Sequence, residues 1–280
     1  MVPMHPAVKK ISRRAGGMSD KKIEVLVAAV DENPVMLAEH MNLQTEAIIC
    51  NQCHLYAYEQ FEHNGRMIRV FSLDERGVGL NRNTALQRTD AGICVFSDED
   101  IVYDDGYEQK ILDEFRKNPK ADVLMFNVRA VEERRTYENT RHKRVHWYNY
   151  GRYPTYSMCA RTESLRKANV SFSLLFGGGA RYSNGEDSLF IHDCLKAGLA
   201  IYATPVSIGH ESKREDAGST WFEGYNEKFF YDRGVLYHYL YGCMARPLAL
   251  RFLCKHRSAM CRTIPLTKAY ALMKKGIREA

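Results

Sequence analysis

The sequence predicts an α/β protein in which helices flank a mostly parallel sheet, with a helical extension at the C-terminal end. Two observations lead to this prediction. Apolar runs typical of buried strands alternate with segments of helical periodicity from residue 23 to about residue 131. Beyond residue 225, basic and apolar residues mix in a pattern that is typical of helices.

The first half of the chain supplies most of the predicted sheet. Residues 23–30 form a continuous apolar run, as expected of a strand that is buried on both faces. Asn33 and Pro34 provide the N-cap and the first-turn proline of a short helix through about Gln44. Further strands are expected at 47–50, 67–73, 92–97 and 122–131, and further helices at 82–88 and 106–117.

The second half of the chain is less regular. Residues 132–156 are charged and aromatic, and they form either a merely packed loop or an acceptor-binding loop whose rings stack on sugars. Short strands are expected at 157–160 and 201–205, on either side of a helix over 186–196. We therefore expect three parts, a basic N-terminal tail over 1–22, a catalytic domain over 23–225 and a basic helical extension over 226–280.

The net charge of +6 is unevenly distributed along the chain. Residues 1–22 carry a net charge of +5 and residues 246–280 one of +8, which leaves residues 23–245 at −7. We expect no nucleic-acid partner, because the body is acidic and no RNA-binding signature is present. The basic residues 246–280 either pack as solvated helices or contact the inner face of a membrane as a peripheral surface.

The sequence also predicts a cytoplasmic location. Its apolar runs are far shorter than the roughly 18 residues that span a bilayer. Residues 1–22 lack the apolar core of a secretory signal. Cys50 and Cys53 form a lone CxxC pair without the further ligands of a zinc site, so we expect reduced thiols.

Candidate site residues follow the predicted strands, because ligands of parallel α/β sheets bind beyond the carboxyl ends of the strands. Asp98, Glu99 and Asp100 come directly after an apolar strand. In an extended chain, Asp98 and Asp100 would point to one side and Glu99 to the other. Two convergent carboxylates repel each other, so they favour Mg²⁺, Mn²⁺ or ligand hydroxyls as a partner. A solvated acidic turn is the alternative interpretation.

A second candidate is the loop from Glu75 to Asn83. Gly77 permits a tight turn, while Arg82 and Asn83 provide hydrogen-bond donors for phosphate and hydroxyl groups. The loop has neither the P-loop pattern nor GxGxxG, and by itself it indicates only a turn before a helix.

Two further candidates lie in the second half. Glu186 and Asp187 begin a predicted helix after a glycine-rich segment, where Asp187 could serve as a general base. The alternative is capping of that helix by Asn184 and the favourable dipole of acids in its first turn. His210 follows a predicted strand and is either a metal or phosphate contact or a structural residue.

These segments together resemble glycosyltransferase family 2. They are "IEVLVAAVDENP", "ERGVGLNRNTAL", "AGICVFSDEDIVYDDGY" and "GGGARYSNGEDSLFIHDCLKAGLAIYATPVSIGHE", and they extend over residues 23–212. The resemblance, which is to bacterial members, implies a GT-A (Rossmann-like) fold and an inverting, metal-dependent transferase of polysaccharide biosynthesis. It implies a nucleoside-diphosphate-sugar donor, with UDP as the expected nucleotide, and a hydroxyl of a glycan or lipid-linked glycan as acceptor.

The resemblance also implies a role for each residue that matches. Asp98 would face the donor ribose, Asp100 would hold Mn²⁺ or Mg²⁺ on the diphosphate, and His210 would lie near the metal or the diphosphate. Asp187 would be the catalytic base and Glu186 its companion. The other donor-binding candidates are Ala29, Asp31, Asn51, Gln52, Gly77, Arg82, Asn83 and Glu99. Asn51 and Gln52 stand where many family members have an acid, so the nucleobase stays open.

Two other classes of function remain as alternatives. One is a non-enzymatic basic protein that binds nucleic acid or membranes, against which the acidic body argues. The other is a nucleotidyltransferase that uses the same carboxylates on a nucleoside triphosphate. No glycine-rich activation loop with a following lysine lies near the N-terminus, which argues against this second alternative.

Overall fold

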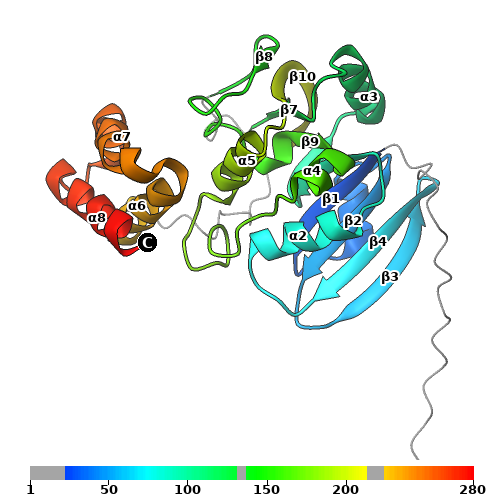
Figure 1. Ribbon diagram of the computed structural model, residues 1–280. Coiled ribbons are helices and arrows are strands. Elements are labelled where there is room, and N and C mark those ends of the chain that lie inside the picture. Colours follow the sequence, from blue (N-terminus) through cyan, green and yellow to red (C-terminus); the bar gives the residue numbers. More distant parts are fainter. Residues whose placement is uncertain (1–22, 131–136, 213–223) are drawn as a thin grey trace, which may run out of the picture.

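A computed structural model describes residues 23–130, 137–212 and 224–280, and Figure 1 shows its arrangement. One sheet has the strand order β3-β4-β2-β1-β5-β9-β7-β10-β6, and β8 pairs with β10 beside this path. The strands are β1 Ile23–Val30, β2 Glu46–Gln52, β3 Ala57–His63, β4 Arg66–Leu73, β5 Ile93–Asp98, β6 Ile101–Tyr103, β7 Val123–Arg129, β8 Lys143–Arg144, β9 Met158–Arg161 and β10 Ile201–Glu211.

Helices cover both faces of the sheet, as the α/β prediction requires (Figure 1). Helices α2, α4, α5 and α6 pack on one face, and α1 and α3 pack on the other. The predicted fold class is therefore confirmed. The helices are α1 Pro34–His40, α2 Val78–Arg88, α3 Tyr107–Lys117, α4 Thr162–Ala168, α5 Glu186–Lys196, α6 Glu227–Tyr241, α7 Ala245–Met260 and α8 Leu266–Glu279, with 3₁₀ turns η1 Thr155–Ser157 and η2 Gly242–Met244.

The sheet is mixed, with two groups of parallel strands separated by an antiparallel strand. Strand β1 pairs in parallel with β2 and β5, β2 pairs in parallel with β4, and β7 with β10. Strand β9 enters between β5 and β7 in the antiparallel direction, and β6 and β8 run antiparallel to β10. The carboxyl ends of β1, β2 and β5 consequently meet at one edge, which is where the candidate residues were expected.

Several predicted boundaries were wrong. Asn33 caps α1 as expected, by accepting from the backbone N–H groups of Val35 and Met36, but the helix ends at His40 rather than near Gln44. Strand β3 was missed because it lies largely exposed and has little apolar content. It forms a hairpin with β4 through Asn64 and Gly65, whose φ angles of 51° and 71° suit a tight two-residue turn.

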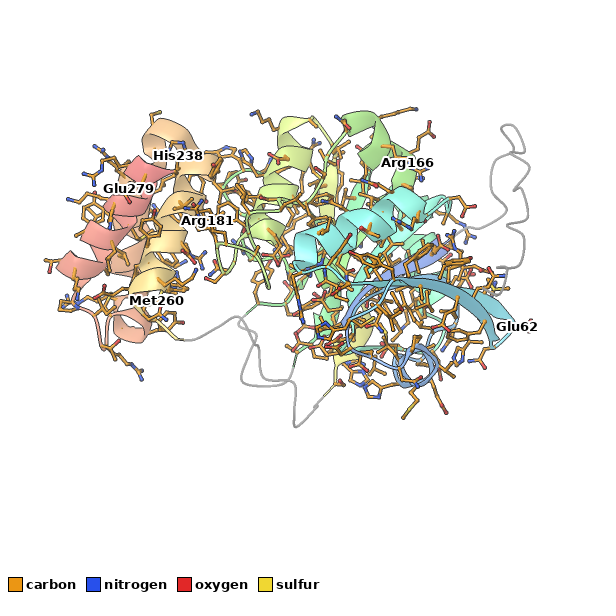
Figure 2. All side chains as sticks on the ribbon, turned by 90° about the horizontal axis from the view of Figure 1, so that it is seen from below. Glu62, Arg166, Arg181, His238, Met260 and Glu279 are labelled. Carbon is orange, nitrogen blue, oxygen red and sulfur yellow. The ribbon has the colours of Figure 1, made fainter. Side chains whose placement is uncertain are left out.

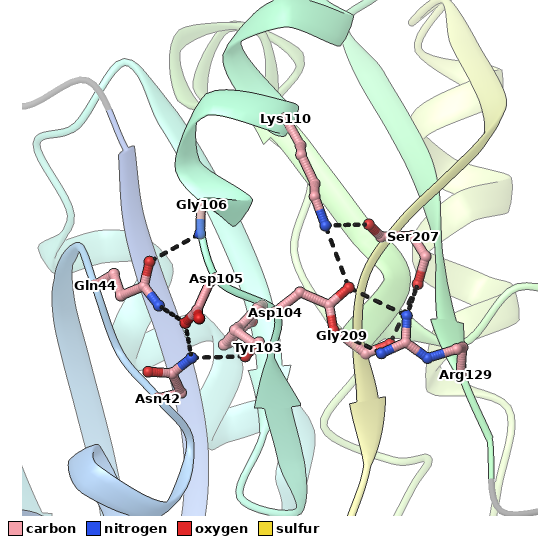
Figure 3. Close-up of polar contacts among 10 residues, drawn as sticks. All are labelled: Asn42, Gln44, Tyr103, Asp104, Asp105, Gly106, Lys110, Arg129, Ser207 and Gly209. Carbon is pink, nitrogen blue, oxygen red and sulfur yellow. Dashed lines mark hydrogen bonds and ion pairs between the residues drawn. The ribbon is translucent and has the colours of Figure 1, made fainter.

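The connection between β6 and α3 is held by a polar network (Figure 3). Asp104 accepts hydrogen bonds from Arg129 at 2.6 Å and Lys110 at 3.3 Å, and the Arg129 guanidinium lowers the pKa of the Asp104 carboxyl. Asp105 accepts from Gln44 at 2.8 Å. The backbone N–H of Asp104 also donates to the carbonyl oxygen of Ile208. These contacts fix β6 against β10, the strand that carries His210.

The C-terminal helices form a unit with its own core. Helix α6 faces both ways, because Val235 and Leu236 join the core of the sheet while Phe230 packs with α7 and α8. Figure 2 shows this unit, marked by His238 and Met260, at the opposite end of the molecule from Glu62 on β3. Within the described ranges, no helix is both long enough and apolar enough to cross a membrane.

Candidate active site

Arg82 of α2 joins three carboxylates at the edge of the sheet. Its side chain is only 5% exposed. Nη2 donates to Asp98 Oδ1 at 2.8 Å, while Nη1 lies 3.2 Å from Asp187 Oδ1 and 3.3 Å from Glu186 Oε1. Asp98 ends β5, whereas Glu186 and Asp187 begin α5. One buried cation therefore holds the ends of two elements together.

Arg82 rests on a stack of aromatic rings. Its guanidinium carbon lies 5.5 Å from the centre of the Phe172 ring, which stacks on Phe190 of α5 at 3.9 Å. Asn83 fixes this platform, since its amide donates to the carbonyl oxygen of Phe172 at 2.9 Å and accepts from the Phe172 N–H at 2.8 Å. In this conformation Asn83 positions the ring under Arg82, and its predicted contact with a donor remains a prediction.

Glycines allow the loops to approach Arg82 and Glu186 closely. Helix α2 begins after Gly77, whose φ of 114° is unfavourable for other residues, and extends earlier than the predicted 82–88. A Cβ on Gly79 would lie 2.2 Å from the carbonyl oxygen of Ser173, and one on Gly177 would lie 2.8 Å from the Glu186 carboxyl carbon. The glycine-rich segments of the sequence thus serve close packing around the cluster.

Asp187 has a second partner, which sequence reasoning missed. The hydroxyl of Thr155, a fully buried residue of η1, donates to the same Oδ1 atom that Arg82 approaches. Capping of α5 by Asn184 is wrong: the N-cap is Gly185, and no side chain caps the helix. Thr155 lies in a segment that the sequence marked only as aromatic, and no local signal connects it with Asp187.

Glu186 and Asp187 have higher pKa values than ordinary surface carboxylates. Burial and the neighbouring Asp187 charge raise the pKa of Glu186 to about 7, against the opposing effect of Arg82. Burial also raises the pKa of Asp187, although Arg82 and the Thr155 hydroxyl favour its charged form. The three nearby carboxylates in turn raise the pKa of Arg82, so the guanidinium stays charged. Asp187 is 32% exposed and can be reached from solvent.

The acidic segment after β5 is a turn, not an extended chain. Glu99 and Asp100 form the turn between β5 and β6, so the expected alternation of side chains along an extended segment is wrong. Glu99 reaches across to β1, where its Oε2 atom accepts from the backbone N–H of Val30 at 2.7 Å. The ends of β5 and β1 are thereby linked.

The remaining candidates lie along the same edge. The backbone N–H of Asp31, just beyond Ala29 in β1, donates to the carbonyl oxygen of Gln52 at 3.0 Å. Gln52 donates from Nε2 to the carbonyl oxygen of Gly77 at 3.2 Å. Asn51 makes two hydrogen bonds with the backbone of Glu32, which hold the loop after β1. The structure thus brings the predicted nucleoside region next to α2, while the roles of these residues remain predictions.

His210 lies on β10, opposite Val102 of β6. The Nδ1 atom of His210 is buried and has no hydrogen-bond partner, and the backbone N–H of Ser212 donates to the carbonyl oxygen of Asp100 at 2.7 Å. No group of three or more potential metal ligands occurs in the part of the chain that the structure describes. A magnesium ion commonly takes one or two carboxylates and completes its shell with phosphates and water. The unpartnered Nδ1 atom of His210 is compatible with such an ion, and the metal role of Asp98, Asp100 and His210 remains a prediction.

The fold and this edge of the sheet define a class, the α/β proteins whose ligands bind at the carboxyl ends of parallel strands. Residues 54–179 match the family Glycosyl transferase family 2. The match confirms the resemblance found in the sequence. It includes Arg82, Asp98, Asp100 and Thr155, and it ends before Asp187.

Solved structures of S. aureus TarS share the fold. TarS 1–349 in complex with UDP-GlcNAc has a TM-score of 0.60 and 17% identity, over 86% of this chain and 74% of that one. TarS 1–349 has a TM-score of 0.58 and 15% identity, over 92% and 81%. TarS 1–349 in complex with UDP has a TM-score of 0.56 and 15% identity, over 86% and 73%. No curated protein sequence matches the chain.

Proposed function

We propose that this protein transfers a sugar from a nucleoside-diphosphate-sugar to a hydroxyl of a glycan or lipid-linked glycan, with inversion at the anomeric carbon. The observation that carries the proposal is the joining of Asp98, Glu186 and Asp187 by the buried Arg82. It links the predicted donor side, at the end of β5, with the predicted base at the start of α5. The TarS complexes with UDP and UDP-GlcNAc make UDP-sugars the first donors to test.

Asp187 is the proposed base. Its raised pKa makes it a better proton acceptor than an ordinary aspartate, while Arg82 and Thr155 favour the charged form that a base needs. The carboxylate takes the proton of the acceptor hydroxyl, whose oxygen bonds to the anomeric carbon. The bond between that carbon and the diphosphate oxygen breaks on the opposite face, and the electron pair leaves with the nucleoside diphosphate.

A divalent cation has a defined place in this proposal. Asp98, Asp100 and His210 are the residues that would hold Mn²⁺ or Mg²⁺ beside the diphosphate. When bound, the ion would neutralise charge on the departing phosphates. Arg82 has a separate task, because it holds the Asp98 carboxylate and the base in position.

The segment that leads into Thr155 is the proposed acceptor-binding region. Trp147 and Tyr148 are 68% and 66% exposed. Tyr150 and Tyr153 in the same segment are buried and anchor it. The segment also passes close to the start of α5, since a Cβ on Gly151 would lie 3.9 Å from the hydroxyl oxygen of the residue after Asp187. Exposed rings on an anchored segment beside the base suit the stacking of a sugar, which agrees with a role in polysaccharide biosynthesis.

The test measures donor binding and transfer separately. Calorimetry with UDP-sugars, with and without Mn²⁺, should detect binding that Asp100→Asn weakens only when the metal is present. Asp187→Asn should bind the donor as the wild type does and release no UDP with an acceptor glycan. An active Asp187→Asn protein would exclude this residue as the base. No binding of any nucleotide sugar would favour the non-enzymatic alternative.

A further inference from the structure

Helix α7 carries an unbalanced positive charge. It contains four permanent cations and no acid in its sixteen residues: Arg246, Arg251, Lys255 and Arg257. None of the four forms a salt bridge with a residue that the structure describes. The neighbouring helices contain paired cations, since Lys228 of α6 pairs with Asp232 and Lys268 of α8 pairs with Glu227 of α6.

The four cations share the solvent side of α7 with a few apolar groups. All four are exposed, whereas Ala249 and Leu253 of the same helix are buried in the helical unit. Leu250, one turn after Arg246, is 40% exposed, and Met244, which directly precedes α7, is 53% exposed. Other apolar residues of the segment 246–280 pack in the core of the unit, namely Leu248, Phe252, Leu253, Leu266, Tyr270, Leu272 and Met273.

A fifth cation lies at the seam between α6 and α7. The guanidinium of Arg233 is 5.2 Å from the centre of the Phe229 ring and 5.3 Å from that of Phe252. Its Nε atom is buried without a hydrogen-bond partner, and its side chain makes no ion pair with a described residue. His256 also lies at this seam, and burial together with the charges of Lys255 and Arg233 lowers its pKa.

We propose that this cationic face, formed by the exposed residues of α7, docks on an anionic phospholipid bilayer. The unpaired cations would find lipid phosphates as partners, and Leu250 and Met244 would enter the interface between headgroups. A nucleic acid would use the cations but would leave these apolar side chains without a matching environment. The inference goes beyond sugar transfer and does not depend on it.

The experiment is co-sedimentation of the full chain with vesicles. Phosphatidylcholine vesicles containing about 30% phosphatidylglycerol should bind the protein at least about tenfold more strongly than pure phosphatidylcholine. Raising the salt from about 0.1 M to about 0.5 M should reduce this binding, because exposed charges are screened. The variant R251E/K255E should lose most of the binding.

A matched variant distinguishes vesicle binding through this face from an effect of net charge alone. Lys120 and Lys196 are exposed, lie outside the helical unit and can be reversed in K120E/K196E with the same change in charge. This control should bind vesicles as the wild type does. Equal loss in both variants, or equal binding to neutral vesicles, would overturn the proposal, as would tighter binding to duplex DNA than to anionic vesicles.

Nucleotide-sugar binding is measured on the same variants, with melting curves to establish that each is folded. Neither pair lies at the Arg82 cluster, so donor binding should be unchanged. Loss of vesicle binding with retained donor binding supports the membrane face whichever sugar is transferred. Failure of donor binding in the wild type would count against the proposed function alone.

Discussion

Arg82 and Asp187 meet across 105 positions of sequence, with the Nη1 and Oδ1 atoms 3.2 Å apart. The same guanidinium contacts Asp98 at 2.8 Å through its other terminal nitrogen. A planar group with two terminal nitrogens can serve both acids at once, which a point charge on a flexible stem cannot. The identity of this side chain therefore matters beyond its charge.

The first prediction concerns Arg82→Lys. Lysine would leave part of the carboxylate cluster unpaired, and we expect the free energy of unfolding to fall by about 2–4 kcal/mol. Urea denaturation measures the effect. Arg116→Lys is the control, because Arg116 forms only an exposed surface pair with Asp113 and should change stability little. Equal stabilities of the two variants would show that the cluster does not depend on the guanidinium.

The second prediction concerns Thr155→Val, which removes the hydroxyl that donates to Asp187. A hydrogen bond to a carboxylate favours its charged form, so the pKa of Asp187 should rise when the bond is lost. The acidic limb of the pH–rate profile should then move to higher pH, and kcat should fall. Thr155→Ser keeps the hydroxyl and should restore the limb. An unmoved limb in Thr155→Val would exclude Thr155 as a positioning residue.

The sequence predicted the local elements that bear the candidate residues. Strand β1 matches its predicted range, and α5 begins and ends at the predicted residues 186 and 196. These segments carry strong local patterns, a buried apolar run and a helical period with acids in the first turn. Strand β3 has no such pattern, because it is an exposed edge strand stabilised by its hairpin with β4.

The relations within the site could not be predicted in the same way. Asn83 reads as a free donor in the sequence, and only the fold shows that both ends of its amide bind the Phe172 backbone. Glu99 likewise reads as a member of an acidic triad, yet it bridges to Val30 on another strand. Such contacts depend on packing between segments that are far apart in the sequence. No local sequence pattern indicates this packing.

The third prediction concerns the pH dependence of stability through Glu186. Its pKa in the folded state is about 7, above its ordinary value of 4.5. Between these values the folded state binds the proton that the unfolded state has lost, so stability falls as the pH rises from about 4.5 to about 7.

The glutamine in Glu186→Gln cannot ionise, so the stability of this variant should not fall for this reason as the pH rises. Relative to the wild type, the variant should gain up to about 3 kcal/mol of stability between pH 5 and pH 8. Urea denaturation at the two pH values measures the difference. The control Glu163→Gln alters an exposed acid paired with Lys167 and should show no such gain. If the difference in the free energy of unfolding between Glu186→Gln and the wild type is the same at both pH values, Glu186 is ionised in the folded state over this range.

The last prediction tests the contact that builds the C-terminal unit. Helices α6 and α8 cross at two glycines, where a Cβ on Gly234 would lie 2.2 Å from the carbonyl oxygen of Met273 and one on Gly276 would lie 2.2 Å from that of Tyr231. Gly234→Ala must push the helices apart, at a cost of about 1–3 kcal/mol that the better helix propensity of alanine offsets only in part. Gly151→Ala is the control, since its added Cβ meets nothing closer than 3.9 Å. Thermal unfolding should show a lower Tm for Gly234→Ala alone. A Tm equal to that of the control would mean that the two helices can separate at this crossing without loss of packing.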